Sequence, residues 1–350
     1  MKTDFFNINL DNSLLIGFYG GGNLGDELIL EVLMNLFKER GYKNIDFYYS
    51  NPGFYNIFHH DFGYKMIDAK KRTDLFISLL RAKNIVIGGG GLWGLDFNKS
   101  IFFLSLILFF SRFILGKKVY LVGVGYYNSA TYFGRIGAFF AGMASNVILA
   151  RDQESRKNFR FFQKKTLLKE DISFLLPDLN LGAYKEETDS LDKLLHLSEI
   201  SVFISVRRFQ KKYSNNYLQI ILGVIRNNPN KSFILATFEP REIDPEGYAL
   251  CFELSKNNKN VQYLEFRYNP VALYLYLKIN KDKLITITPQ YHGILLAYMA
   301  GCDFFPLSYD NKCRELLMVI SKIKNIINIY NLTVQDLQKF IDEKDYSKNI

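Results

Sequence analysis

Cysteine is scarce in this chain, and its three residues, Cys251, Cys302 and Cys313, form no CxxC pair and no metal-ligand spacing. An odd number of widely spaced cysteines argues against a disulfide framework and suits a reducing compartment such as the cytoplasm. The sequence also offers no ligand cluster for a metal ion. A signal peptide is not expected, because Asp4 and Asp11 interrupt any apolar core at the start of the chain.

Long apolar runs and dense basic runs are missing as well. The most apolar segment, residues 101–115, contains Arg112 and is short for a membrane span. We expect a buried or partly exposed helix there, and the alternative is a hydrophobic face that touches a membrane. No run of Lys and Arg is interleaved with aromatic residues, so nucleic-acid binding is not expected.

The composition is that of a globular protein with an excess of positive charge. The chain has 350 residues, of which 48% are hydrophobic and 23% charged, and this length predicts two domains. It carries 44 Lys and Arg against 35 Asp and Glu, which gives a formal net charge of +9. The charge favours anionic partners, such as a membrane surface or a phosphorylated or acidic substrate. A general basic bias of the chain explains it equally well.

Strand patterns alternate with helix patterns along both halves of the chain. Strands are expected at 13–19, 44–50, 84–87, 118–125, 146–151, 200–207, 232–238, 261–266 and 284–289. Helices are expected at 26–40, 73–82, 101–115 and 131–143, and Thr333 with Asp336 predicts the capped start of a terminal helix. Repeated alternation of this kind predicts parallel sheets wrapped by helices.

We therefore predict an α/β protein with two Rossmann-like domains and a central cleft. Residues 1–181 form the expected N-terminal domain, and the polar residues 182–199 form a linker or surface segment. Residues 200–330 form the expected second domain, and 331–350 a terminal helix and tail. Clefts of this architecture hold ligands at the carboxyl ends of strands. The oligomeric state is left open.

Three glycine clusters follow predicted strands, and the first of them resembles a nucleotide cradle. Gly20, Gly22 and Gly25 satisfy G-x-G-x-x-G between a strand and a helix, the context of a dinucleotide fingerprint. The remaining features fit poorly, because the second strand does not end in an acidic residue. Asp26 and Glu27 would also repel a pyrophosphate. They fit better as helix N-terminal charges, or as groups that accept hydrogen bonds from sugar hydroxyls or position backbone.

The other two clusters, GGGG at 88–91 and VGVG at 122–125, also end predicted strands. Three strand ends without side chains favour a surface on which a bulky ligand rests. The alternative is a set of tight strand-to-helix turns, which require glycine in any case.

An ordered set of short motifs resembles one known family. The motifs are GGGNLGDE (20–27), GGGG (88–91), ARDQES (150–155), PD (177–178), SVR (205–207), YHGILLAYMAG (291–301) and YDNK (309–312). Together they resemble the polysaccharide pyruvyl transferase family over roughly residues 16–320. The resemblance implies a fold like that of glycosyltransferases of the B architecture. It also implies transfer of the pyruvyl group of phosphoenolpyruvate to a sugar of a bacterial cell-envelope polysaccharide or its lipid-linked precursor, without a cofactor.

The resemblance implies a donor site as well. His292 matches the histidine of the family, its general acid, and Lys312 matches a lysine about twenty residues later. Arg151 and Arg207 match basic positions that would bind the phosphate and carboxylate of the donor. One departure is Gln290, because many members have a basic residue two places before the histidine. This departure keeps a glycosyltransferase with a nucleotide-sugar donor as the alternative function.

The acceptor side is expected in the N-terminal domain. Its acceptor or loop positions are Gly22, Asn23, Asp26, Gly90 and Trp93. The polar side chains among them either bind acceptor hydroxyls or brace the loop, and the tryptophan either stacks on a sugar face or fills the core. The glycan or lipid-linked acceptor, the positive charge and the apolar helix all suit an enzyme that works at the inner face of an anionic membrane.

Two further expectations concern paired residues. Arg151 has two equally supported predictions. It forms a structural ion pair with Asp152 at the start of a helix, or it binds the donor. His59 and His60 are expected in a surface loop, with contact to the acceptor as the alternative.

Overall fold

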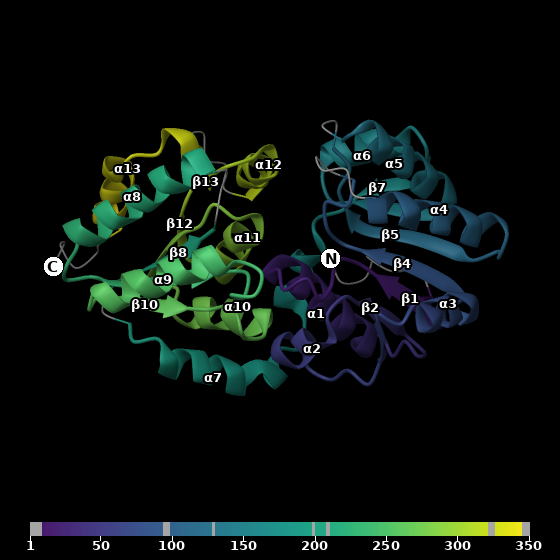
Figure 1. Ribbon diagram of the computed structural model, residues 1–350, viewed down its shortest axis with the longest axis horizontal. Helices are drawn as coiled ribbons and strands as arrows, with labels where there is room; N and C mark the ends of the chain where they lie inside the picture. The colour runs from purple at the N-terminus through teal and green to yellow at the C-terminus, as the bar shows by residue number, and fades with distance from the viewer. Residues whose placement is uncertain are drawn as a thin grey trace. The chain divides into compact units, whose positions relative to one another are not determined.

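The computed structural model describes residues 9–93, 99–127, 130–197, 200–207, 211–320 and 326–344. The chain divides into two compact units, Met1–Gly21 with Asp26–Asn180, and Gly22–Gly25 with Leu181–Ile350. The four residues Gly22–Gly25 therefore group with the second unit, although their neighbours on both sides group with the first. Each unit contains its own sheet (Figure 1).

The first unit is built on a parallel sheet whose described strands follow the order β3-β2-β1-β4-β5-β6-β7. The strands are β1 (Ser13–Ile16), β2 (Asp46–Tyr49), β3 (Lys65–Asp68), β4 (Asn84–Gly88), β5 (Lys118–Val124), β6 (Val147–Ala150) and β7 (Thr166–Leu168). The helices are α1 (Leu24–Glu39), α2 (Pro52–Phe58), α3 (Arg72–Arg81), α4 (Lys99–Phe113), α5 (Tyr132–Ala144) and α6 (Gln153–Arg160), followed by the 3₁₀ helix η1 (Ile172–Asp178). The strand order reverses between β1 and β4, which makes their carboxyl ends a topological switch point.

The second unit repeats this plan with a parallel sheet in the order β10-β9-β8-β11-β12 over the described residues. Its strands are β8 (Ser201–Val206), β9 (Ser232–Thr237), β10 (Val261–Leu264), β11 (Leu284–Ile287) and β12 (Asp303–Phe305), and β13 (Leu307–Ser308) pairs with β14 (Ile327–Asn328). The helices are η2 (Gly182–Tyr184), α7 (Lys185–Leu194), α8 (Lys211–Asn227), α9 (Pro245–Asn257), α10 (Pro270–Ile279), α11 (Tyr291–Ala300), α12 (Asn311–Ile320), η3 (Ile329–Asn331) and α13 (Val334–Glu343). The switch point of this sheet lies between β8 and β11.

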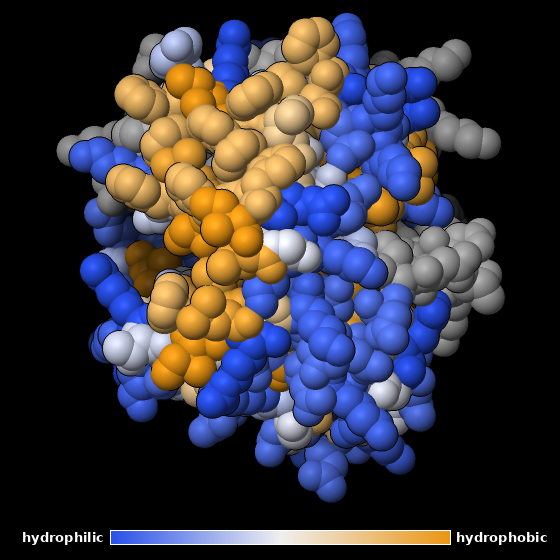
Figure 2. Space-filling view, turned by 90° about the vertical axis from the view of Figure 1, so that its right-hand side faces the viewer, coloured by the Kyte–Doolittle hydropathy of each residue, from blue (hydrophilic) through white to orange (hydrophobic). Residues whose placement is uncertain are grey.

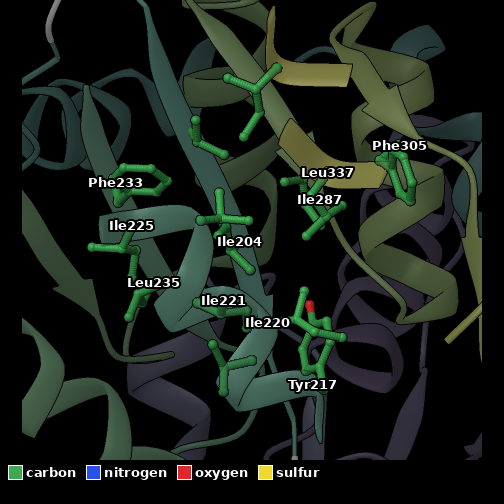
Figure 3. Packing of buried hydrophobic residues seen from close by; sticks show 14 of the residues in the cluster. Ile204, Tyr217, Ile220, Ile221, Ile225, Phe233, Leu235, Ile287, Phe305 and Leu337 are labelled. Atoms are coloured by element: carbon green, nitrogen blue, oxygen red, sulfur yellow. The ribbon is translucent and has the colours of Figure 1, made fainter. Parts of the chain in front are cut away.

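The central strands β1, β4, β8 and β11 are buried along their whole length, because helices cover both faces of each sheet there. All six residues of β8, SVFISV, are buried, as expected for a central strand of a parallel sheet. In the second unit Ile204 of β8 packs with Ile221 of α8, Leu235 of β9 and Leu337 of α13 (Figure 3). In the first unit α3, α4, α5 and α6 contribute to one continuous core with β1, β4, β5 and β6.

The strand and helix patterns read from the sequence agree with these elements to within a few residues. Thr333 and Asp336 form the predicted capping box, since each side chain accepts a hydrogen bond from the backbone N–H of the other. The sequence pattern did not predict the short elements α2, β3, β7, β12, β13 and β14. The polar segment 182–199 begins with η2 and α7, and α7 packs on α10. Among the described residues no helix has the length and apolarity needed to cross a membrane.

Tyr19 gives two of the glycines a packing role. Its hydroxyl donates a hydrogen bond to the carbonyl of Gly88 at 2.6 Å. A Cβ on Gly88 would lie 2.3 Å from that hydroxyl oxygen and 2.6 Å from Cδ1 of Leu33, and a Cβ on Gly17 would lie 2.3 Å from the Tyr19 ring. The tyrosine is 1% exposed. Glycine at these strand ends therefore makes room for a buried aromatic side chain.

We expect Gly88→Ala to lower the stability of the protein by about 1–3 kcal/mol, because the added methyl group overpacks a site bounded by Tyr19 and Leu33. Thermal unfolding followed by circular dichroism measures the change. Gly53→Ala is the matched control, since a Cβ there meets only Asn51 Oδ1 at 3.5 Å. This control variant should be neutral or more stable by up to about 1 kcal/mol. Equal melting temperatures for the two variants would contradict the packing role.

Candidate functional site

Three of the four residues predicted for the donor site, His292, Arg207 and Lys312, belong to the second unit. Arg207 directly follows β8, and Pro289, Gln290 and His292 follow its neighbour β11. Because both strands are parallel, these residues lie at the same edge of the sheet. The edge is the place where open α/β sheets bind ligands.

His292 is the second residue of α11, and its imidazole packs against Gly25. A Cβ on Gly25 would lie 1.9 Å from Nδ1 of His292, so only glycine leaves room for the ring. The next residue, Gly293, is also restricted, since a Cβ there would lie 2.1 Å from the hydroxyl of Thr288. These two close approaches position the histidine at the start of α11.

The turn that carries Gly25 is held to the end of β9. The backbone N–H of Leu24 donates a hydrogen bond to the carbonyl of Phe238 at 2.9 Å. Asn23 donates from its amide to Glu239 Oε1 at 3.0 Å, and its Oδ1 accepts from the N–H of Gly25 at 3.0 Å. Asn23 therefore braces the loop, which was one of its two predicted roles. Gly22, in the same turn, is buried with a φ of 73°.

Arg207 and Lys312 both lie near the end of β11. Arg207 donates a hydrogen bond to the hydroxyl of Tyr309 at 3.2 Å, and its guanidinium lies 5.8 Å from the ring centroid. Cys313 contacts the carbonyl of Pro289 through its sulfur at 3.3 Å. Burial and the charge of Asp310 raise the pKa of the Cys313 thiol, while Lys312 and Arg207 oppose this rise. The two cations are therefore neighbours of the same thiol. Tyr309, the aromatic partner of Arg207, is the first residue of the YDNK motif, but no role was predicted for it.

Arg151 has a different environment in the first unit. Its side chain is 5% exposed and forms ion pairs with Asp171 at 3.5 Å and Asp152 at 3.7 Å. It also donates hydrogen bonds to the hydroxyl of Tyr127. Asp152 caps α6 by accepting from the N–H of Ser155 at 2.7 Å. Arg151 therefore occupies the structural ion pair that was the alternative to donor binding.

Trp93 fills the core of the first unit. It is 1% exposed, its indole N–H donates to the hydroxyl of Ser105 at 3.2 Å, and its ring packs edge-on against Phe159. A side chain buried in this way fits the core-filling alternative and not a platform for a sugar.

Gly20 of the first glycine cluster and the clusters at 88–91 and 122–125 lie at or just after the ends of β1, β4 and β5, which are neighbours in the first sheet. Gly90 has a φ of 83°, and a Cβ on it would lie 3.6 Å from Oδ1 of Asp26. Asp26 is partly exposed in the first turn of α1. The predicted acceptor positions Asp26 and Gly90 thus lie side by side at the switch point of this unit.

A buried cluster of ionisable groups supports the first glycine loop. His59 lies between two carboxylates, with Nε2 2.8 Å from Glu27 Oε2 and Nδ1 2.6 Å from Glu31 Oε2. Glu27 also accepts from the N–H of Gly20 and from the hydroxyl of Tyr49, each at 3.0 Å. Burial lowers the pKa of His59, but the hydrogen bonds and charges of Glu27 and Glu31 outweigh it and raise the pKa to about 9.

This cluster corrects the expectation that His59 lies in a surface loop, since the residue is only 6% exposed. Glu27 positions backbone, as its place in the sequence suggested. The available signal was the spacing of Glu27 and Glu31, four residues apart on the apolar side of a helix, which places both carboxylates on a buried face.

The raised pKa predicts a pH dependence of stability. A histidine with an unfolded pKa near 6.5 and a folded pKa of about 9 contributes its full stabilisation below pH 6.5 and loses it as the pH rises through 9. The contribution is about 3 kcal/mol. Chemical denaturation of the wild type between pH 6 and 10 should therefore show falling stability.

His59→Gln should remove most of this dependence and cost about 3–5 kcal/mol at neutral pH, because two buried carboxylates lose their cation. His196→Gln is the control, since His196 is exposed. A wild-type curve that stays flat from pH 6.5 to 9 would refute a charged imidazole at this position.

Comparisons with known proteins identify a matching family and similar solved structures. The model of the polysaccharide pyruvyl transferase family matches residues 23–311. No curated protein matches the chain. The chain is similar to the putative UDP-N-acetylglucosamine 2-epimerase from Listeria monocytogenes, with a TM-score of 0.62 at 11% identity, over 96% of this chain and 89% of that one.

Two other solved structures are similar over nearly their whole length. The UDP-GlcNAc 2-epimerase of Methanocaldococcus jannaschii has a TM-score of 0.62 at 14% identity, with 94% of this chain and 91% of that chain covered. The E. coli ADP-heptose lps heptosyltransferase II has a TM-score of 0.50 at 12% identity, with 97% and 99% covered. At these identities the likeness concerns the fold alone. It confirms the predicted class of two α/β domains with parallel sheets, as in the glycosyltransferase-B architecture.

Proposed function

Because this chain belongs to the polysaccharide pyruvyl transferase family, we propose that it transfers the pyruvyl group of phosphoenolpyruvate to a sugar of a bacterial surface polysaccharide or its lipid-linked precursor. The single observation that carries the proposal is the gathering of His292, Arg207 and Lys312 at the switch point of the second sheet. The reaction uses phosphoenolpyruvate as a substrate and requires no cofactor in this proposal.

The donor has two anionic groups, and two side chains of the second unit supply cations for them. Arg207 can pair with a carboxylate or phosphate through two parallel N–H donors, whereas Lys312 contributes a compact charge. Stacking on Tyr309 orients the guanidinium of Arg207. Arg151 is left out of this donor site because Asp152 and Asp171 already neutralise its charge.

His292 is the proposed general acid. A hydroxyl of the acceptor adds to C2 of the donor while the imidazolium gives a proton to the methylene carbon, which becomes the methyl group. The proton of this first hydroxyl returns to the imidazole. The C2–O bond to phosphate then breaks, and a second hydroxyl of the acceptor closes the ketal, its proton leaving with the phosphate as hydrogen phosphate. Fixed positive charge at the site stabilises the leaving phosphate. Imidazole suits the proton transfer because it titrates near neutral pH.

A glycosyltransferase with a nucleotide-sugar donor is the alternative, and Gln290 is the observation that favours it. The residue stands where many family members carry a cation, and its side chain is 6% exposed at the N-terminus of α11. A neutral amide there leaves one positive charge fewer for the donor. The two functions differ in their products, which are inorganic phosphate in one case and a nucleoside diphosphate in the other.

The first test is phosphate release from phosphoenolpyruvate in the presence of acceptor glycans. His292→Asn should lower kcat by about 10²–10⁴-fold, the usual contribution of a general acid. His196→Asn, an exposed histidine of the same unit, is the matched control and should keep full activity. Release of a nucleoside diphosphate from a nucleotide sugar, with no phosphate released from phosphoenolpyruvate, would support the alternative instead.

A second test uses the packing between Gly25 and His292. Gly25→Ala suits the helical start of α1 but places a methyl group 1.9 Å from the Nδ1 position, so the imidazole must move. We expect kcat to fall, while the melting temperature changes little. Gly21→Ala is the control, since a Cβ there meets only the carbonyl of Phe18 at 3.4 Å. Full activity of Gly25→Ala would show that the position of the ring is unimportant.

A further inference from the structure

Helix α4 exposes large apolar side chains, unlike an ordinary surface helix. The side that faces the protein carries the buried residues Ile101, Ser105, Leu108 and Ser111. The outward residues are large and apolar: Phe103 is 59% exposed, Ile107 41%, Phe110 54% and Phe113 56%. Surface helices of globular proteins normally turn polar residues outward. The outer side of α4 is therefore as apolar as its inner side.

Helix α5 also exposes large apolar side chains. Its buried residues are small, namely Gly137, Ala138, Ala141, Gly142 and Ala144. Its exposed residues include Tyr132, Phe133, Phe139 and Met143, with exposed fractions of 75%, 50%, 42% and 43%. Small residues on the inner side allow α5 to pack closely on α4, as shown by the Cβ of Gly137, which would lie 3.3 Å from the hydroxyl of Ser105.

Aromatic contacts join these helices into one continuous apolar face. Successive ring centroids lie 4.6 to 5.5 Å apart along the series Phe113, Phe109, Phe140, Phe139, Phe162 and Phe161. The series runs from α4 across α5 to the end of α6, where Phe161 is 87% exposed. We call this surface the α4–α5 face. Figure 2 shows an extended apolar area on the side of the first unit where α4 lies in Figure 1.

The segment that carries α4 and α5 has charges of one sign. No Asp or Glu occurs between residues 97 and 151, whereas Lys99, Arg112, Lys117, Lys118 and Arg135 lie within that segment and are exposed or partly exposed. Arg160, Lys164 and Lys165 are exposed and lie close to Phe161 in the sequence. Exposed cations therefore lie on or next to the elements that form the apolar face.

We propose that the α4–α5 face binds the surface of an anionic lipid bilayer, with α4 and α5 lying in the plane of the interface. Aromatic and aliphatic side chains would enter the boundary between headgroups and acyl chains, and these Lys and Arg residues would contact anionic headgroups. Both features are typical of helices that lie on membranes rather than cross them. The inference does not depend on the chemistry proposed for the switch point.

A second copy of the chain is the other candidate occupant, and the charge argues against it. A symmetric dimer through this face would bring the same cations of both copies together. The segment 97–151 provides no carboxylate with which to pair them. A bilayer with anionic headgroups provides the opposite charge, which is why the membrane is the better fit.

Flotation of the full-length protein with lipid vesicles tests the proposal. The vesicles are equimolar phosphatidylglycerol and phosphatidylcholine, with pure phosphatidylcholine as the uncharged comparison. The wild type should float with the anionic vesicles and much less with the uncharged ones, and added salt should weaken binding. No donor or acceptor is present, so the result is independent of catalysis.

Two pairs of variants separate the apolar and the charged contributions. Phe110→Ser with Phe139→Ser should lower the vesicle-bound fraction about ten-fold or more, because two large apolar groups leave the interface. The matched control, Phe252→Ser with Ile279→Ser, removes similarly exposed apolar residues of the second unit. Lys99→Gln with Lys118→Gln should weaken binding to anionic vesicles only, and Lys256→Gln with Lys259→Gln is its charge-matched control.

The proposal is overturned if the wild type does not float with anionic vesicles, or if the Phe110/Phe139 variant floats as well as its control. It is also overturned if light scattering shows a wild-type dimer that this variant dissociates while vesicle binding is unchanged. Unaltered circular dichroism of the variants establishes that they are folded. If the Phe110/Phe139 variant does not fold, the Lys99/Lys118 variant provides the second test.

Discussion

Close packing between Gly25 and the imidazole of His292 is the contact on which the candidate site depends. The ring occupies the space that any side chain at position 25 would need. The turn is held in place by Phe238 and Glu239 at the end of β9. At the other end of the same loop, Glu27 accepts from Gly20 and is itself held by His59. A buried carboxylate is stable there because a cation and hydrogen-bond donors surround it.

The excess of positive charge has three different uses in the structure. Arg151 is buried and paired with two carboxylates, so its charge supports the fold of the first unit. Arg207 directly follows β8 and Lys312 lies at the start of α12, and both are proposed to bind the anionic donor. A third group lies on or next to the elements that form an apolar surface. The net charge of +9 could not distinguish these uses, because it sums cations whose surroundings differ.

Helices α4 and α5 show how internal packing can determine the outer surface. Ser105 lies inside because it accepts from the indole of Trp93 and donates to the carbonyl of Ile101. The glycines and alanines of α5 lie inside because they allow close approach to α4. Small and hydroxyl side chains take many of the inner positions, and several large apolar residues of both helices are turned outward. Such a surface is stable in water only at a cost in exposed apolar area, which is why a partner is expected.

Local patterns in the sequence determined much of this protein. The periodicity of apolar residues identified most strands and helices, the Thr333–Asp336 spacing identified a capped helix, and the ordered motifs identified the family and with it the fold. The role of single side chains was decided only by tertiary structure. The ion pair of Arg151 depends on Asp171, and the buried position of His59 depends on Glu27 and Glu31. These pairs join residues about twenty to thirty positions apart, and local propensity carries no information on such contacts because they form only when separate elements pack together.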